Sequence, residues 1–113
     1  MTVQEFFDCY YMHDSSIEWL EYDNDTLKLY CIFCDFLQSD YQEGDYSNSD
    51  IIITFYHASF EADLSLLNDA EFLSQKVDGN KVSFFMESSG HLFTELHITA
   101  DSVDVTKIRS YNL

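Results

Sequence analysis

Long stretches of the chain alternate apolar and polar residues with the period of two that is typical of β-strands. Residues 51–57 are β-branched and aromatic, and they predict a strand. Residues 27–34 also alternate, but both sets of side chains are largely apolar, so we expect this strand to be covered on both faces. The turn signal Asp23-Asn24-Asp25 comes directly before it, and residues 16–22 are expected to be its hairpin partner.

The second half of the chain repeats the pattern in shorter runs. Residues 82–86 follow the turn signal Asp78-Gly79-Asn80, and residues 92–99 follow a second turn at residues 88–90. A last short strand is expected around residues 103–106, where two valines alternate with polar residues.

One helix is predicted to start at Asn68, which can cap it with Glu71 as the reciprocal partner three residues later. Residues 3–11 fit either a helix or a strand. We therefore expect a mainly β (α+β) fold, an antiparallel sheet or sandwich of six to seven strands with one short helix. The length of the chain predicts a single domain over residues 1–113.

Charge adds a strong asymmetry to this picture. The chain has 21 acidic and five basic residues, a net charge of −16. Residues 1–75 carry 16 of the acids and a single base, Lys28, whereas residues 76–113 are nearly neutral. So few bases cannot neutralise phosphates, which argues against nucleic acid and anionic membrane surfaces as ligands. The acidic part is instead suited to attracting a cationic partner. The aromatic content of 17% argues against a disordered acidic tail.

The three cysteines are expected to be reduced. The N-terminus has no basic segment followed by an apolar run, which predicts no signal peptide and a cytoplasmic location. Cys31-x-x-Cys34 has the spacing of a metal or redox motif, but only Cys9 remains as a further thiol. Residues three apart on a strand point to opposite faces, so we favour core positions over a ligand or redox role. We expect no metal and no cofactor.

Other candidate chemistry is weak, and we expect that the protein is not an enzyme. His13-Asp14 is able to orient an imidazole for general-base work, but no nucleophile accompanies it. A turn in which Asp14 accepts backbone N–H groups explains the pair better. Residues 38–50 form a polar loop with four carboxylates. Asp45, Asn48 and Asp50 lack the spacing of an EF-hand calcium loop, which leaves only weak divalent binding open.

The remaining candidate is a protein-binding patch in which carboxylates surround accessible aromatic rings. Rings of this kind supply contact energy at interfaces, and charges at the rim raise the association rate. The alternative is an ordinary solvated surface with the rings turned into the core. The expected partner-binding residues are Glu18, Trp19, Glu21, Asp23, Asp25, Asp40, Tyr41, Glu43, Asp45 and Tyr46.

The segment His13-Asp-Ser-Ser-Ile17, followed by Trp19, by residues 25–29 and by residues 31–38, resembles small bacterial proteins with an HDS-x-I opening strand and a following hairpin. Some of these are grouped with polymorphic-toxin immunity proteins. The similarity covers roughly residues 6–60. It implies a cytosolic β-rich domain, in some members one that neutralises a toxin, and it assigns no catalytic residue.

Together, the charge and the resemblance favour an immunity or inhibitor protein that blocks a basic protein partner such as a toxin nuclease. A DNA-mimic anti-restriction or anti-defence protein of a mobile element is the second alternative, because it would also bind its target through a dense negative charge. A structural domain whose charge only maintains solubility is the third alternative. Pairing through an edge strand leaves a homodimer open.

Overall fold

The alternating runs become antiparallel strands because each places one set of side chains in a common core. The computed structural model describes residues 1–113 and contains eight strands. Their bounds are β1 (Ser16–Asp23), β2 (Thr26–Cys34), β3 (Asn48–Tyr56), β4 (Ser59–Ala62), β5 (Ala70–Asp78), β6 (Lys81–Glu87), β7 (Phe93–Thr99) and β8 (Ser102–Tyr111). The helix α1 (Val3–Cys9) and the 3-10 turns η1 (Asp35–Leu37) and η2 (Leu64–Leu66) complete the secondary structure.

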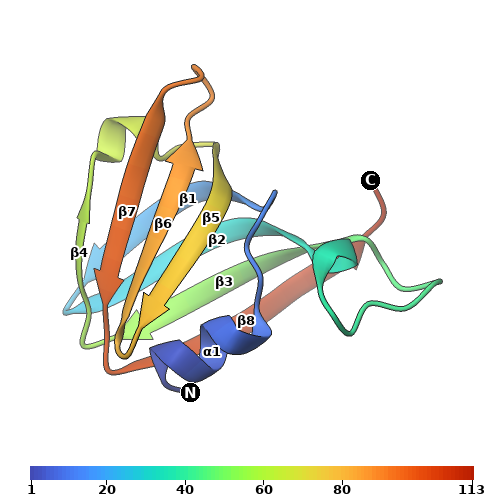
Figure 1. Ribbon diagram of the computed structural model, residues 1–113, viewed down its shortest axis with the longest axis horizontal. Helices are drawn as coiled ribbons and strands as arrows, with labels where there is room; N and C mark the ends of the chain where they lie inside the picture. Colours follow the sequence, from blue (N-terminus) through green and yellow to red (C-terminus); the bar gives the residue numbers. More distant parts are fainter.

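All eight strands belong to one sheet with the order β4-β7-β6-β5-β1-β2-β3-β8. The sheet bends over on itself, so that β1, β2, β3 and β8 form one layer and β4 to β7 form a second layer that crosses it (Figure 1). The two layers join at β1 and β5 through only two residue pairs, Ser16 with Glu71 and Ile17 with Ala70. The sheet does not close, because β4 and β8 remain unpaired with each other.

The core of 23 buried residues fills the space between the layers. Helix α1 lies across the open lower end of this space in Figure 1 and contacts β5, β6 and β8. A capping box starts the helix, since the Thr2 hydroxyl accepts from the Glu5 N–H and the Glu5 carboxylate accepts from the Thr2 N–H. Phe7 stacks on Phe55 of one layer and packs edge-on against Phe84 of the other, so the helix connects both layers.

The expected class is confirmed: the fold is mainly antiparallel β with one short helix. It has eight strands rather than six to seven, because the four-residue β4 carries too short a pattern to be recognised and β5 was predicted as a helix. The predicted helix after Asn68 is wrong. That segment is β5, in which Ala70 and Phe72 point into the core and a bulge before Ser74 interrupts the alternation. The short helix is instead α1, which decides the ambiguity over residues 3–11.

The expectation that β2 is covered on both faces is also wrong. Its inner set, headed by Leu27 and Leu29, is buried in the core. Its outer side chains, such as Tyr30 and Ile32, are half-buried by their sheet neighbours alone, because no helix or second layer lies over this face. No helix of the protein has the length and apolar character required to span a membrane.

Candidate functional site

The loop of residues 38–47 connects η1 to β3 and projects beyond the end of the first layer (Figure 1). It lacks aliphatic side chains, so polar groups hold its shape. The Tyr41 hydroxyl donates to the Asp45 carbonyl over 3.1 Å, and the Asp45 carboxylate accepts from the Gln42 N–H over 3.0 Å. Gly44 takes a φ of 98° at the tip, a conformation that favours glycine.

Gln38 ties the base of this loop to the segment after α1. Its amide nitrogen donates to the Tyr11 carbonyl over 2.7 Å, and its amide oxygen accepts from the Tyr11 N–H over 2.9 Å. A further bond from the same nitrogen reaches the Cys34 carbonyl. These bonds tie the base of the loop to the segment after α1 and to the end of β2.

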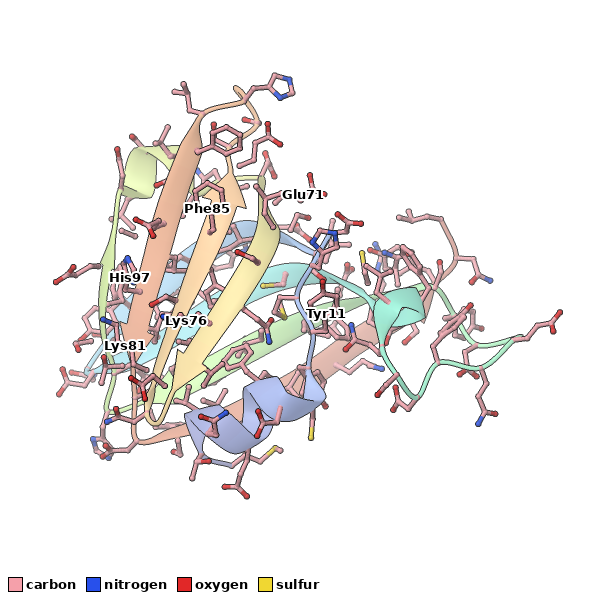
Figure 2. All side chains as sticks on the ribbon, viewed as in Figure 1. Tyr11, Glu71, Lys76, Lys81, Phe85 and His97 are labelled. Carbon is pink, nitrogen blue, oxygen red and sulfur yellow. The ribbon has the colours of Figure 1, made fainter.

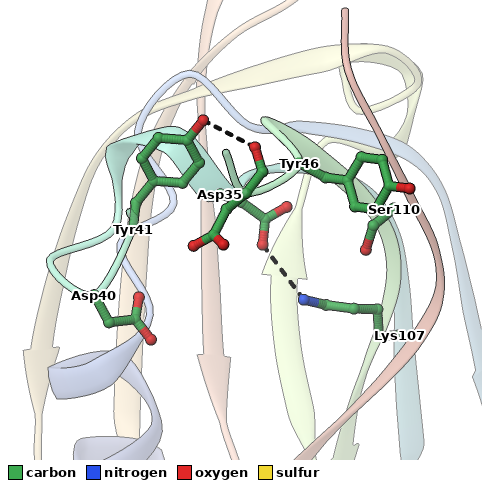
Figure 3. A pocket seen from close by; sticks show the side chains of 7 residues that line it. Asp35, Asp40, Tyr41, Tyr46, Lys107 and Ser110 are labelled. Carbon is green, nitrogen blue, oxygen red and sulfur yellow. Dashed lines mark hydrogen bonds and ion pairs between the residues drawn. The ribbon is translucent and has the colours of Figure 1, made fainter. Parts of the chain in front are cut away.

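A hollow of about 280 Å³ lies between this loop and β8 (Figure 3). We call it the acidic hollow, and it is lined by Asp35, Asp40, Tyr41, Asp45, Tyr46, Lys107 and Ser110. A second hollow continues from it toward α1 and shares Asp35, Asp40 and Lys107 with it. We call this one the apolar hollow, because its other lining residues are mostly apolar: Cys9, Tyr10, Phe33, Gln38, Ile51 and Val105. The two hollows together are called the groove below.

The groove carries an excess of negative charge. The charge of Asp35 is balanced by the Lys107 ammonium, which lies 3.4 Å from its carboxylate (Figure 3). The same carboxylate accepts a hydrogen bond from the Ser49 hydroxyl at 2.6 Å. Asp40 and Asp45, by contrast, form no ion pair with any base.

The other bases are too far away or already paired. Lys28 lies opposite Glu21 near the β1–β2 turn, at the far end of β2 from the loop. Lys76 and Lys81 lie on the second layer, away from the loop (Figure 2). Arg109 bonds the Asp50 carboxylate at 2.6 Å on the outer face, which raises the pKa of the guanidinium. The loop carboxylates are therefore exposed to solvent and form no ion pair, since Lys107, the base in the same hollow, is paired with Asp35.

The ten predicted partner-binding residues fall into three places instead of one continuous patch. Those in the loop are Asp40, Tyr41, Glu43, Asp45 and Tyr46, and all but Glu43 line the acidic hollow. Those on the body of β1 are Glu18, Trp19 and Glu21. Asp23 and Asp25 lie at the β1–β2 turn, at the opposite end of β2 from the loop. The nine residues of β2 hold these ends roughly 26 Å apart at the usual rise per residue.

Trp19 and Tyr30 form a separate cluster on the uncovered face of the first layer. Their rings stack at 3.9 Å across β1 and β2, and Trp19 is 46% exposed. The Tyr30 hydroxyl donates to Glu21, and burial together with this carboxylate raises the pKa of Tyr30. At the rim of the same face, burial and the bond to Asp50 raise the pKa of Tyr111 to about 12.

Sequence reasoning missed the β8 side of the groove. Asp35, Lys107, Ser110 and Val105 come from η1 and β8, and nothing in the chain order indicates that β8 returns beside β3. The one available signal was the alternation of Val103, Val105 and Lys107, which continues the final strand past the expected end.

Among the histidines, only His97 lies within hydrogen-bond distance of a side-chain hydroxyl group. Neighbouring residues on an extended chain face apart, but the side chains of His13 and Asp14 approach to 3.4 Å at a turn in which Asp14 takes a φ of 64°. Ser83 Oγ lies 2.8 Å from His97 Nδ1 on the outer face of β6 and β7. Both strands are flanked by neighbours, so their backbone N–H groups are used in the sheet rather than free to stabilise an oxyanion.

The cysteines are free thiols. Cys31 and Cys34 are buried, as a core role predicts, and burial raises the pKa of both. Cys9 is exposed at the end of α1. No group of three or more His, Cys, Asp or Glu side chains has the geometry to hold a metal ion.

Comparison with models of known protein families, with curated proteins and with solved structures gives no match to this chain.

Proposed function

We propose that this protein is a non-enzymatic binding protein that blocks a basic protein partner through the groove, in the manner of an immunity or inhibitor protein facing a toxin nuclease. The observation that carries the proposal is the pair of loop carboxylates, Asp40 and Asp45, which form no ion pair and lie beside two tyrosine rings. The resemblance of residues 6–60 to immunity-type proteins points the same way.

The composition of the groove suits recognition of a cationic surface. Tyr46 is 58% exposed and Tyr41 is half-buried, so both offer ring surface to a partner. One carboxylate and one cation at about 6 Å attract by roughly 0.7 kcal/mol in water, and several such pairs add up to a substantial bias at low salt. Attraction of this kind acts mainly on the association rate and weakens as salt rises.

The test uses two triple variants that change the net charge by the same amount. In the loop variant, Asp40→Asn, Glu43→Gln and Asp45→Asn remove the charges around the groove. In the control variant, Asp78→Asn, Asp101→Asn and Asp104→Asn remove three exposed charges elsewhere, none of which forms an ion pair. Each set raises the net charge of −16 by three units.

Each immobilised protein captures partners from its host, and a captured basic protein is purified for stopped-flow association at several salt concentrations. We expect the wild type and the control variant to bind it with a rate that falls steeply with salt. We expect the loop variant to associate about tenfold more slowly at low salt, which corresponds to about 1.4 kcal/mol. Equal rates for the two variants, or a rate indifferent to salt, would contradict the proposal.

A further inference from the structure

We infer that the partner binds as an extended segment that adds an antiparallel strand to the free edge of β8, with basic residues at the acidic hollow and apolar residues at the apolar hollow. This inference rests on the proposed function and specifies how its partner is held. It concerns the backbone of β8, which the charge argument does not involve.

The backbone edge of β8 is unpaired beyond Val103, although α1 contacts this strand. β8 is the last strand in the sheet order and pairs only with β3. The backbone groups of Val103 face outward, where they bond Met1 through a 2.8 Å and a 3.3 Å contact. Because outward and inward groups alternate along an antiparallel strand, those of Val105 and Lys107 also face outward. No backbone partner beyond β3 occupies them.

The groove lies over the inner face of β2, β3 and β8 and reaches this edge at Val105 and Lys107. Val105 and Lys107 both line the apolar hollow, beside Tyr10 of the segment that leaves α1. Phe33 and Ile51 complete its apolar surface. A strand placed beside β8 would turn alternate side chains toward the inner face of the sheet, where they would border the groove at Val105 and Lys107.

Charge gives the incoming strand a polarity. The apolar hollow lies beside Val105, whereas Asp45 and Ser110 line only the acidic hollow, toward the other end of the edge; Asp40 lines both hollows. An antiparallel strand passes Ser110 first and Val105 last. Its N-terminal half is thus expected to carry Lys or Arg, and its C-terminal half to carry aliphatic residues.

A second copy of this chain fits the edge less well than a basic partner. Two molecules that each carry −16 repel one another over the whole approach. The one base at the groove, Lys107, is already paired with Asp35. The loop carboxylates can therefore pair only with cations that another molecule supplies. The observations thus favour a basic segment from another protein.

The experiment measures binding of synthetic fluorescein-labelled peptides by fluorescence anisotropy. The first peptide has the sequence Lys-Thr-Arg-Thr-Val-Thr-Val-Thr, and the second has the same residues with the basic half at the C-terminal end. The third peptide has the sequence of the first, with the backbone nitrogen of every other residue methylated. Methylation keeps the charge but removes backbone N–H donors that strand pairing needs.

On the protein side, Lys107→Pro is compared with Lys107→Ala. Both remove the ammonium, but only proline removes the outward N–H, and proline is tolerated at the edge of a sheet. The circular dichroism spectrum of each variant shows that it is folded. The loop variant described above is included to test the charge alone.

We expect the first peptide to bind at least about tenfold more tightly than the reversed and the N-methylated peptides. We expect Lys107→Pro to weaken it about fivefold relative to Lys107→Ala, the loss of one backbone bond. Equal binding of all three peptides, with loss only in the loop variant, would overturn strand addition and leave the acidic binding site standing. Binding that even the loop variant retains would overturn the groove as a site, and dimers seen by sedimentation that exclude the peptide would assign the edge to a second copy.

Discussion

Replacing Phe6 by alanine tests whether α1 is an integral part of the fold and of the groove. Phe6 is fully buried, and its ring stacks on Tyr10 at 4.4 Å and meets Phe7 edge-on at 4.8 Å. The helix has only seven residues, too few to be stable alone, so packing of its apolar side chains must hold it in place.

The expected loss follows from the burial of this one ring. A buried phenylalanine removes about 150–250 Å² from water, worth roughly 4–6 kcal/mol at 25 cal/mol per Å² as an upper bound. Alanine retains part of this, so we expect a loss of about 3–5 kcal/mol in the free energy of unfolding. Since small domains are stable by about 5–15 kcal/mol in total, the variant would be folded only marginally or not at all.

Urea unfolding followed by the fluorescence of Trp19 measures the loss. Phe6→Leu conserves the apolar character and should cost less than about 1.5 kcal/mol, which keeps the series measurable if the alanine variant fails to fold. Phe36→Ala is the matched control, because this ring in η1 is 45% exposed and should cost well under half as much as Phe6→Ala. A loss below about 1 kcal/mol for Phe6→Ala would refute the docked position of α1.

Two further predictions concern titratable groups. Burial, followed by the neighbouring Asp14 carboxyl, raises the pKa of Glu71 above its ordinary value of 4.5. The folded protein therefore holds this proton more tightly than the unfolded chain does, and it loses stability as the pH rises above 4.5 and Glu71 ionises. Glu71→Gln should therefore raise the melting temperature relative to wild type at pH 7 and lose this advantage below pH 4.5; an advantage that is independent of pH would exclude this origin. Ellman's reagent should titrate one thiol, Cys9, in the native protein and all three in urea, since Cys31 and Cys34 are buried with raised pKa values; rapid reaction of all three without denaturant would show that the core is open.

The sequence predicts strands well where a turn signal and an alternating run agree. β1, β2 and their turn satisfy both conditions, and so does β6 after Gly79. The pattern fails at β5, because a bulge after Phe72 breaks the period of two and because Asn68 and Glu71 imitate a helix start. Local signals of this kind cannot reveal that the segment is paired on both sides by β1 and β6.

The candidate site is predictable only in part for the same reason. The composition of residues 38–50 indicates an exposed acidic loop, and four of its residues indeed line the acidic hollow. Its other wall comes from β8, about 60 residues later in the chain, as the pairing of Ser49 with Ser110 shows. The placement of Trp19 on a different face from Tyr46 also depends on the direction of β2, which side-chain pattern alone does not reveal.

The strand β8 is synthesised last, although its partner β3 is among the first three strands. β1, β2 and β3 emerge first from the ribosome, the four strands of the other layer follow, and only residues 102–111 return to β3. At translation rates of about 5–20 residues per second, the nascent chain spends several seconds with the Ile51–Phe55 stretch unpaired along one side. During this interval the unpaired edge of β3 is most prone to pair with another nascent chain. The dense negative charge of the first 75 residues is already present at this stage and keeps nascent chains apart.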